Sequence, residues 1–182
     1  MPDQLFYTDS EEANRLIATD PMALLIGFAL DQQVPVQKAF SGPLLIKERL
    51  GSLDPAALAA ADLDAVFRQK PAVHRFPGSM ATRVQELAIH VHDRYDSRAE
   101  RVWTDAVDAH ELRENISGLP GFGEMKVKAL GAVLAKRFGV AAAEDLVPWH
   151  PTLGDVDSAE ALAAYQAAKR AHKAEWAAAQ KA

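Results

Sequence analysis

The sequence lacks cysteine altogether, in a chain of 182 residues. This absence excludes disulfide bonds, thiol catalysis, cysteine-ligated zinc and an iron–sulfur cluster. The chain also has no apolar run of membrane-spanning length and no basic-then-apolar signal segment, so we expect a cytoplasmic protein that does not enter a membrane. An excess of basic residues is missing as well, since the net charge is −5. Because binding to nucleic acid usually rests on basic residues, any contact with DNA must be local.

Apolar residues, in contrast, make up 49% of the chain, which is enough for one buried core. No segment shows the sustained alternation of a strand, so we predict an all-α fold in a single domain over 1–182. Capping residues and prolines mark the helix starts. The predicted helices cover 13–18, 22–30, a segment from Pro35 that Gly42-Pro43 should bend or break, short segments after Asp54 and Asp62, 79–95, a turn or helix in 97–105, a segment from Asp108, 124–137 and 158–180.

The most informative stretch is 117–128, in which Leu119-Pro120-Gly121-Phe122-Gly123 separates two segments of helical periodicity. The two glycines permit a tight turn with positive φ. Such a turn leaves backbone N–H groups open at the start of the next helix, and these bind a phosphate without a basic side chain. A glycine after a helix is also routine in an ordinary helix–loop–helix connection, so the motif alone leaves both interpretations open.

Two further segments extend the pattern. Residues 24–33 read Leu-Leu-Ile-Gly-Phe-Ala-Leu-Asp-Gln-Gln, an apolar helix that ends in a polar turn, and 76–88 read as a loop followed by a helix. Together with 117–128, these segments resemble the helix-hairpin-helix–Gly/Pro/Asp superfamily of base excision DNA repair proteins, in its order and at about its spacing over 20–140. The chain looks most like the small actinobacterial-type branch without an iron–sulfur cluster.

The resemblance implies two all-helical lobes with a cleft between them and the hairpin at its mouth. It also implies a monomeric DNA glycosylase that binds damaged double-stranded DNA, extrudes a base and hydrolyses its N-glycosidic bond. No metal or organic cofactor is implied, although a monovalent cation bound by hairpin carbonyls is common in the superfamily. The segment 158–180 is expected to be an appended outer helix, whose Lys169, Arg170, Lys173 and Lys181 are candidates for DNA contact.

The resemblance assigns DNA contacts to several residues. Gln33 matches a glutamine that fills the gap left by the extruded base, although a polar helix end at the surface is the alternative. Asp31 stands where a small polar residue is more usual, and DNA would repel it unless it is turned away or paired. The remaining candidates for contact with the backbone are Arg83, Gly121, Phe122, Gly123, Lys126 and Lys128.

The reaction type follows from the hairpin. Bifunctional members of the superfamily carry a lysine two residues after the second glycine, which forms a Schiff base with the sugar. Counting without gaps, that position here is Met125, and Lys126 lies about 100° further round the helix. The resemblance therefore implies a monofunctional enzyme that uses water as the nucleophile.

The superfamily also places a catalytic aspartate about 20 residues after the second glycine. That count reaches Ala143, so Asp145 is the first candidate, and Asp155 and Asp157 before the last helix are the alternatives. Such a carboxylate stabilises positive charge on the sugar and orients a water. The usual Asp-Thr-His motif is missing.

His74, Trp149 and His150 are candidates for stacking on or hydrogen bonding to an extruded base. A packed tryptophan is the ordinary alternative. Two other functions stay open: a non-catalytic module that recognises distorted or damaged duplex, and a helical protein whose hairpin binds another protein.

Overall fold

The computed structural model describes residues 1–181, and every regular element in that range is a helix, which confirms the all-α prediction. No single helix in this range has both the length and the apolar composition to cross a membrane, although α1 and α2, bent by 113°, pass that test together. The helices are α1 (Glu11–Thr19), α2 (Pro21–Leu30), α3 (Val36–Leu50), α4 (Pro55–Ala60), α5 (Leu63–Arg68), α6 (Pro77–Tyr95), α7 (Arg101–Thr104), α8 (Ala109–Ser117), α9 (Glu124–Lys136), η1 (Ala141–Leu146), η2 (Leu153–Asp155) and α10 (Ala159–Lys181).

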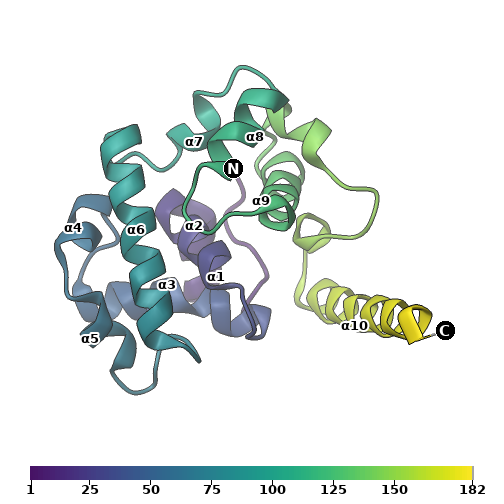
Figure 1. The fold of residues 1–182 in the computed structure, drawn as a ribbon, viewed down its shortest axis with the longest axis horizontal. Coiled ribbons are helices and arrows are strands. Elements are labelled where there is room, and N and C mark those ends of the chain that lie inside the picture. The colour runs from purple at the N-terminus through teal and green to yellow at the C-terminus, as the bar shows by residue number, and fades with distance from the viewer. Residues whose placement is uncertain (182) are drawn as a thin grey trace.

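Helix α2 forms the centre of the core, with α1, α3 and α6 packed around it (Figure 1). All of its residues after Pro21 are buried, which suits a helix that is apolar on every side. A Cβ on Gly27 would lie 2.4 Å from the ring of Phe40, so this glycine lets α3 approach α2 closely. The phenyl ring of Phe40 also meets Tyr7 and Phe28 edge-on, at centroid distances of 5.1 and 5.2 Å.

Helix α3 continues through Gly42 and Pro43, so the predicted break at this point is wrong. An internal proline costs a helix about 3 kcal/mol. Both residues are buried, and a Cβ on Gly42 would lie 2.4 Å from Leu30. Packing of α3 against α1 and α2 therefore outweighs the local penalty.

Six of the predicted helix starts are confirmed by a capping side chain. Each of these residues accepts a hydrogen bond from a backbone N–H in the first turn of its helix. They are Ser10, Asp20, Asp54, Asp62, Asp108 and Ser158. Helix α6 begins at Pro77, two residues earlier than predicted, because a proline at the first helical position is favourable.

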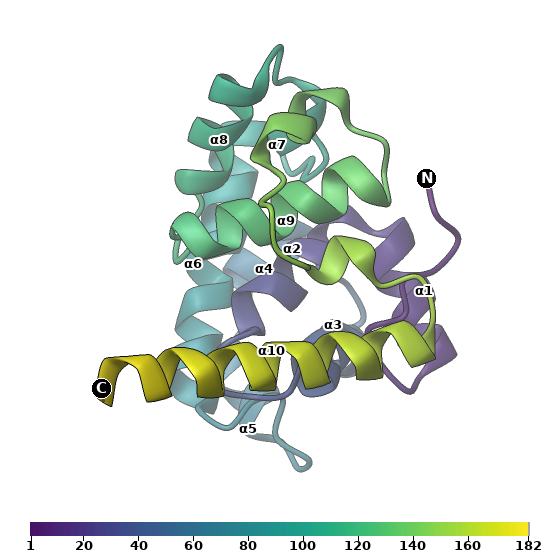
Figure 2. The same ribbon diagram turned by 90° about the vertical axis from the view of Figure 1, so that its right-hand side faces the viewer.

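The last part of the chain folds back on α9. Elements η1 and η2 both pack against α9, and α10 then leaves the body (Figure 1). Turned by 90°, the same helix crosses in front of the body below α9 (Figure 2). This arrangement places α10 near the face that carries the start of α9.

Candidate nucleic-acid interface

The structure brings together the three segments that the sequence singled out. The ammonium of Lys126, in α9, donates a hydrogen bond to the carbonyl of Ala29 near the end of α2, at 3.3 Å. The guanidinium of Arg83, in α6, lies directly against the hairpin, because a Cβ on Gly121 would fall 1.8 Å from its Nη1. The hairpin, the end of α2 and the first turns of α6 therefore share one site.

The hairpin itself is a type II turn. The amide of Phe122 donates to the carbonyl of Leu119 at 3.0 Å, Pro120 occupies the second position, and Gly121 has a φ of 81°. The side chain of Phe122 is buried, so it anchors the turn on the core. The loop therefore has a fixed shape from which α9 starts.

The N-terminus of α9 is open. Its N-cap is Gly123, and no side chain of the described residues caps the helix. Gly123 has a φ of −85°, and a Cβ there would meet nothing within 4 Å, so the fold does not require glycine at this position. An absent side chain does let a ligand approach the backbone closely. The nearby carboxylate of Glu124 is held by Arg113 at 2.6 Å, and this pairing lowers its pKa.

Lys126 and Met125 point in different directions. The side chain of Met125 is exposed, with 84% of its surface accessible, whereas Lys126 is partly buried with its ammonium 5.4 Å from the ring centre of Phe122. Burial lowers the pKa of Lys126 from 10.5 to about 8, Asp31 opposes that shift, and Arg83 adds to it. A sizeable fraction of this amine is therefore neutral at slightly alkaline pH.

Asp31 is a functional candidate to which the sequence assigned no role. It caps the end of α2 and is partly buried. Burial raises the pKa of its carboxyl, while the positive charges of Lys169 and Lys126 lower it in part. The two positive charges lessen the repulsion that this carboxylate would exert on DNA. A charged residue directly after a wholly apolar helix was the available signal.

Lys126 makes the stability of the protein depend on pH. The unfolded chain keeps the proton of this lysine up to about pH 10.5, whereas the folded chain loses it near pH 8. The burial penalty is therefore fully present below pH 8, and the free energy of unfolding rises between pH 8 and 10.5. After allowance for solvent screening we expect about 1–2 kcal/mol from this group.

Urea unfolding at pH 7.5 and pH 10 measures this effect. Other groups also titrate in that range, so the informative quantity is the difference between wild type and Lys126→Met. The variant should gain less stability on alkalinisation, or lose more, than wild type does. An identical change in both proteins would contradict the burial of this amine.

Gln33 follows α2 in a strained conformation. Its φ is 56°, a left-handed value that is unusual for a residue other than glycine, and its side chain is exposed. Such strain is often maintained at functional positions. The preceding Gln32 bonds back to the carbonyl of Ala29 at 3.2 Å, so the turn is held beside Lys126.

His74 supports this turn from inside the protein. It is only 1% exposed, its Nε2 lies 3.0 Å from the carbonyl of Leu30 and 3.1 Å from that of Gln32, and its Nδ1 accepts from the amide of Phe76. Nε2 therefore carries the hydrogen, and burial lowers the pKa of the ring. Because both ring nitrogens are engaged, His74 positions the end of α2 rather than offering a free group to a base.

Trp149 and His150 stand on the surface instead. Trp149 is 92% exposed and meets the ring of His150 edge-on at 5.6 Å. The His150 ring otherwise contacts only the carbonyl of its neighbour Pro151, among hydrogen bonds of the described residues. The structure therefore does not place this pair in a pocket.

The three acids predicted for catalysis differ in their surroundings. Asp145 and Asp157 are exposed, and neither makes a hydrogen bond or ion pair with residues 1–181. Asp155 accepts from the amide of Thr152 at 2.8 Å and pairs with Lys136. Burial opposes ionisation of Asp155, but these contacts prevail and lower its pKa. Asp155 is therefore engaged in holding η2 on α9.

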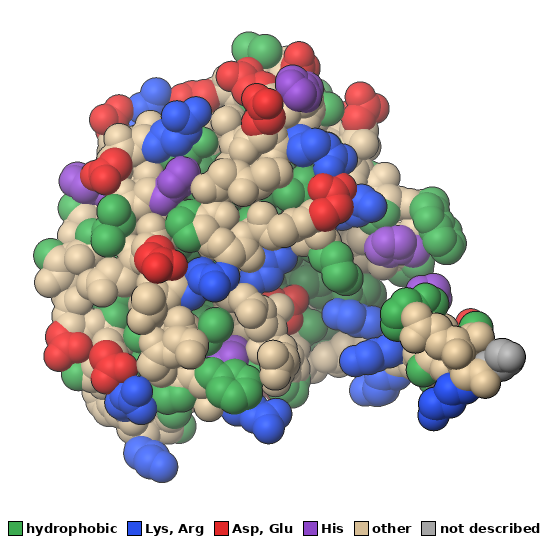
Figure 3. All heavy atoms as spheres, in the orientation of Figure 1, with side chains coloured by type: hydrophobic (Ala, Val, Ile, Leu, Met, Phe, Trp, Pro, Cys, Tyr) green, Lys and Arg blue, Asp and Glu red, His purple; other side chains and the backbone are tan. Residues whose placement is uncertain are grey.

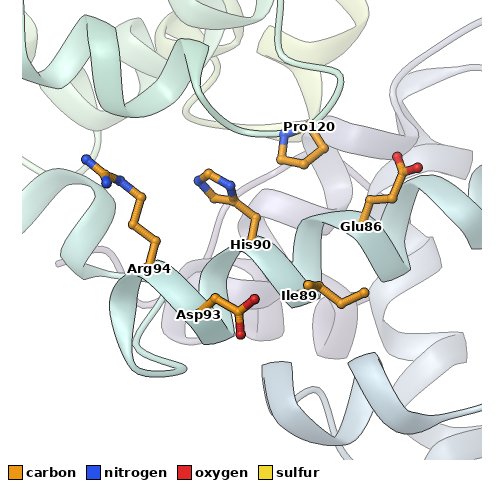
Figure 4. A pocket seen from close by; sticks show the side chains of 6 residues that line it. All are labelled: Glu86, Ile89, His90, Asp93, Arg94 and Pro120. Atoms are coloured by element: carbon orange, nitrogen blue, oxygen red, sulfur yellow. The ribbon is translucent and has the colours of Figure 1, made fainter.

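A shallow groove of about 720 Å³ lies on the other flank of the hairpin. Side chains of α6 line it together with Pro120, and the ring of His90 points toward Pro120 (Figure 4). Among the described residues, Nε2 of His90 is buried without a hydrogen-bond partner, and so is the hydroxyl of Tyr95, whose ring centre lies 6.1 Å from that of His90. Glu86 and Asp93 line the groove beside one cation, Arg94, and two carboxylates make it a poor site for a DNA backbone.

Comparison with known proteins gives no assignment, because no family model, curated protein or solved structure matches the chain. No group of three or more His, Asp or Glu residues within 1–181 is placed to hold a metal ion. The candidate site is therefore defined by the geometry of the hairpin, the end of α2 and α6.

Proposed function

We propose that this protein is a DNA glycosylase-like base excision repair protein of the helix-hairpin-helix–Gly/Pro/Asp superfamily. One observation carries the proposal. The three segments that resemble this superfamily lie far apart in the sequence, yet they are joined through Lys126 with Ala29 and Arg83 with Gly121. The proposal includes two helical lobes with a cleft between them that faces the hairpin.

The hairpin would bind one strand of the duplex. Open amides at the start of α9 would receive a phosphate, with Gly121, Phe122 and Gly123 giving the turn its shape. Lys128 is half-exposed beside Glu124 at 3.9 Å, and Arg83 is one-third exposed, so both cations are available for neighbouring phosphates. A local site of this kind is compatible with a net charge of −5.

Base extrusion would use the turn after α2. Gln33 is exposed and strained, and it would enter the stack where the extruded base has left. Asp31 would then face the sugar of that nucleotide. Its carboxylate would stabilise positive charge on C1′ as the bond to the base breaks, while a water adds to C1′ and the base leaves with a proton.

The nucleophile in this proposal is water. Met125 occupies the position of the Schiff-base lysine and is exposed, and the amine of Lys126 is turned toward Ala29. Lys126 would hold the ionised form of Asp31 through its positive charge. The protein is therefore proposed to be monofunctional, leaving an intact strand with an abasic site.

A panel of duplexes tests the proposed function. Each duplex carries one lesion, namely uracil, hypoxanthine, 8-oxoguanine, 3-methyladenine or thymine glycol, and is analysed with and without alkali. Strand breaks that require alkali on at least one duplex are the expected result. Breaks without alkali, absent in Lys126→Met, would transfer the role of nucleophile to Lys126. No product on any duplex would contradict a glycosylase.

A non-catalytic module that recognises distorted duplex is the second candidate. The observation that favours it is the placement of the predicted acids, since Asp145 and Asp157 are free on the surface and Asp155 is tied to Lys136. Measurable binding to a mismatched duplex, without product from any lesion, would support this candidate over the first.

A further inference from the structure

Helix α10 is long, exposed and richer in cations than the rest of the chain. Of its 23 residues only Leu162 is buried. From Lys169 to its end it carries four basic residues and one acid, in a protein whose net charge is −5. A helix that buries so little apolar surface gains little stability from packing. We therefore expect the exposed side chains of α10 to have a function in binding.

One stripe of α10 faces the body. The first turns use Leu162 and Gln166, and the amides of Gln166 and Gln37 exchange hydrogen bonds of 3.1 and 2.9 Å. At 100° per residue, Lys169, Lys173 and Trp176 continue the same stripe. Lys169 lies over the ring of Tyr165 at 5.7 Å, and its charge acts on Asp31.

The later residues of this stripe are exposed and do not pack against the body. Trp176 is 62% exposed, and Lys173 is exposed one turn before it. Lys and Arg side chains gather on the side of α10 that faces the body, across a hollow (Figure 3). Helix α10 crosses below α9 (Figure 2), and the charge of Lys169 acts on Asp31, so the stripe lies on the side of the molecule that carries the end of α2.

We propose that α10 is a basic arm that binds the phosphate backbone of duplex DNA through Lys169 and Lys173. Charge complementarity favours DNA as the ligand, because two cations one turn apart on a straight, exposed helix can contact neighbouring phosphates of one strand. The inference rests on the proposed function, since the hairpin would hold the same duplex. Trp176, on the same stripe, would cover a sugar or base at the edge of the contact.

The test compares two double variants of the full chain. Lys169→Gln/Lys173→Gln removes both cations of the stripe. Lys47→Gln/Lys70→Gln removes the same charge from two exposed lysines outside α10 whose side chains make no hydrogen bond or ion pair among the described residues. Binding of a fluorescent undamaged 20-base-pair duplex is followed by anisotropy between 50 and 200 mM salt, and circular dichroism checks that both variants keep their helix content.

The stripe variant should bind about tenfold or more weakly at 100 mM salt. The slope of log affinity against log salt should become less steep by about 2, since each lost phosphate contact contributes about 0.9. The control variant should change both quantities much less. Equal losses in the two variants would overturn the arm as a specific contact, because only overall charge would then matter.

The outcomes separate this inference from the proposed function. If the stripe variant binds as wild type does, the arm is overturned while the hairpin proposal stands. If wild type does not bind duplex at all, both fail. Binding to vesicles with phosphatidylserine instead of duplex, lost in the stripe variant, would assign α10 to a membrane surface and overturn the inference.

Discussion

Asp31→Asn is expected to reduce base excision at least 100-fold while duplex affinity stays within about threefold. Removing one group that stabilises transition-state charge typically slows an enzyme by about 10²–10³. Asparagine keeps the size of the side chain, so the end of α2 should retain its shape. The loss should appear in single-turnover excision on whichever lesion the wild-type protein accepts.

Two companion variants make this result decisive. Asp145→Asn changes an exposed carboxylate without a partner among the described residues, so it should excise within about twofold of wild type. The same substitution at Asp155 breaks the pair with Lys136 and should lower stability before it affects chemistry. Loss of activity in Asp145→Asn with full activity in Asp31→Asn would contradict the assignment and restore the prediction from the sequence.

Gly121→Val should destabilise the protein by about 2–3 kcal/mol and weaken duplex binding at least tenfold. The φ of 81° is strained for any residue with a Cβ, and most of all for a β-branched one. The new side chain would also displace Arg83, whose Nη1 lies 1.8 Å from the Cβ position. Urea unfolding and anisotropy binding measure the two effects.

Gly123→Ala is the matched control for this glycine. Its backbone has an ordinary φ, and the added methyl group meets nothing within 4 Å, so we expect a stability change below about 1 kcal/mol. Duplex binding should still fall several-fold, because the methyl group would project where a phosphate approaches. Unchanged binding in both glycine variants would show that the hairpin does not contact DNA.

The all-α class and most helix starts could be predicted because they depend on local sequence. An aspartate or serine before a proline or an apolar stripe indicates a helix start from local sequence alone, as Asp20 and Ser158 illustrate. The helix break predicted at Pro43 was wrong because that prediction considers only the local effect of proline. The packing that outweighs this effect comes from α1 and α2, and the local sequence does not show it.

The site was predicted only in part, for a related reason. Motif reading identified the hairpin and Gln33, since turn residues show their role in the sequence. It did not show that Lys126 points inward and Met125 outward, because one residue of register decides that direction. Nor did it show that Asp31 lies among Lys126 and Lys169, because those charges come from distant helices.

The most direct test of the central claim, that the hairpin binds DNA, is a nuclear magnetic resonance titration of ¹⁵N-labelled protein with a short duplex. We expect the largest amide shifts at residues 121–126, with a second group around Gln33 and at 169–176. Shifts concentrated elsewhere, for example around the groove of Glu86, Asp93 and Arg94, or no shifts at all, would contradict this claim.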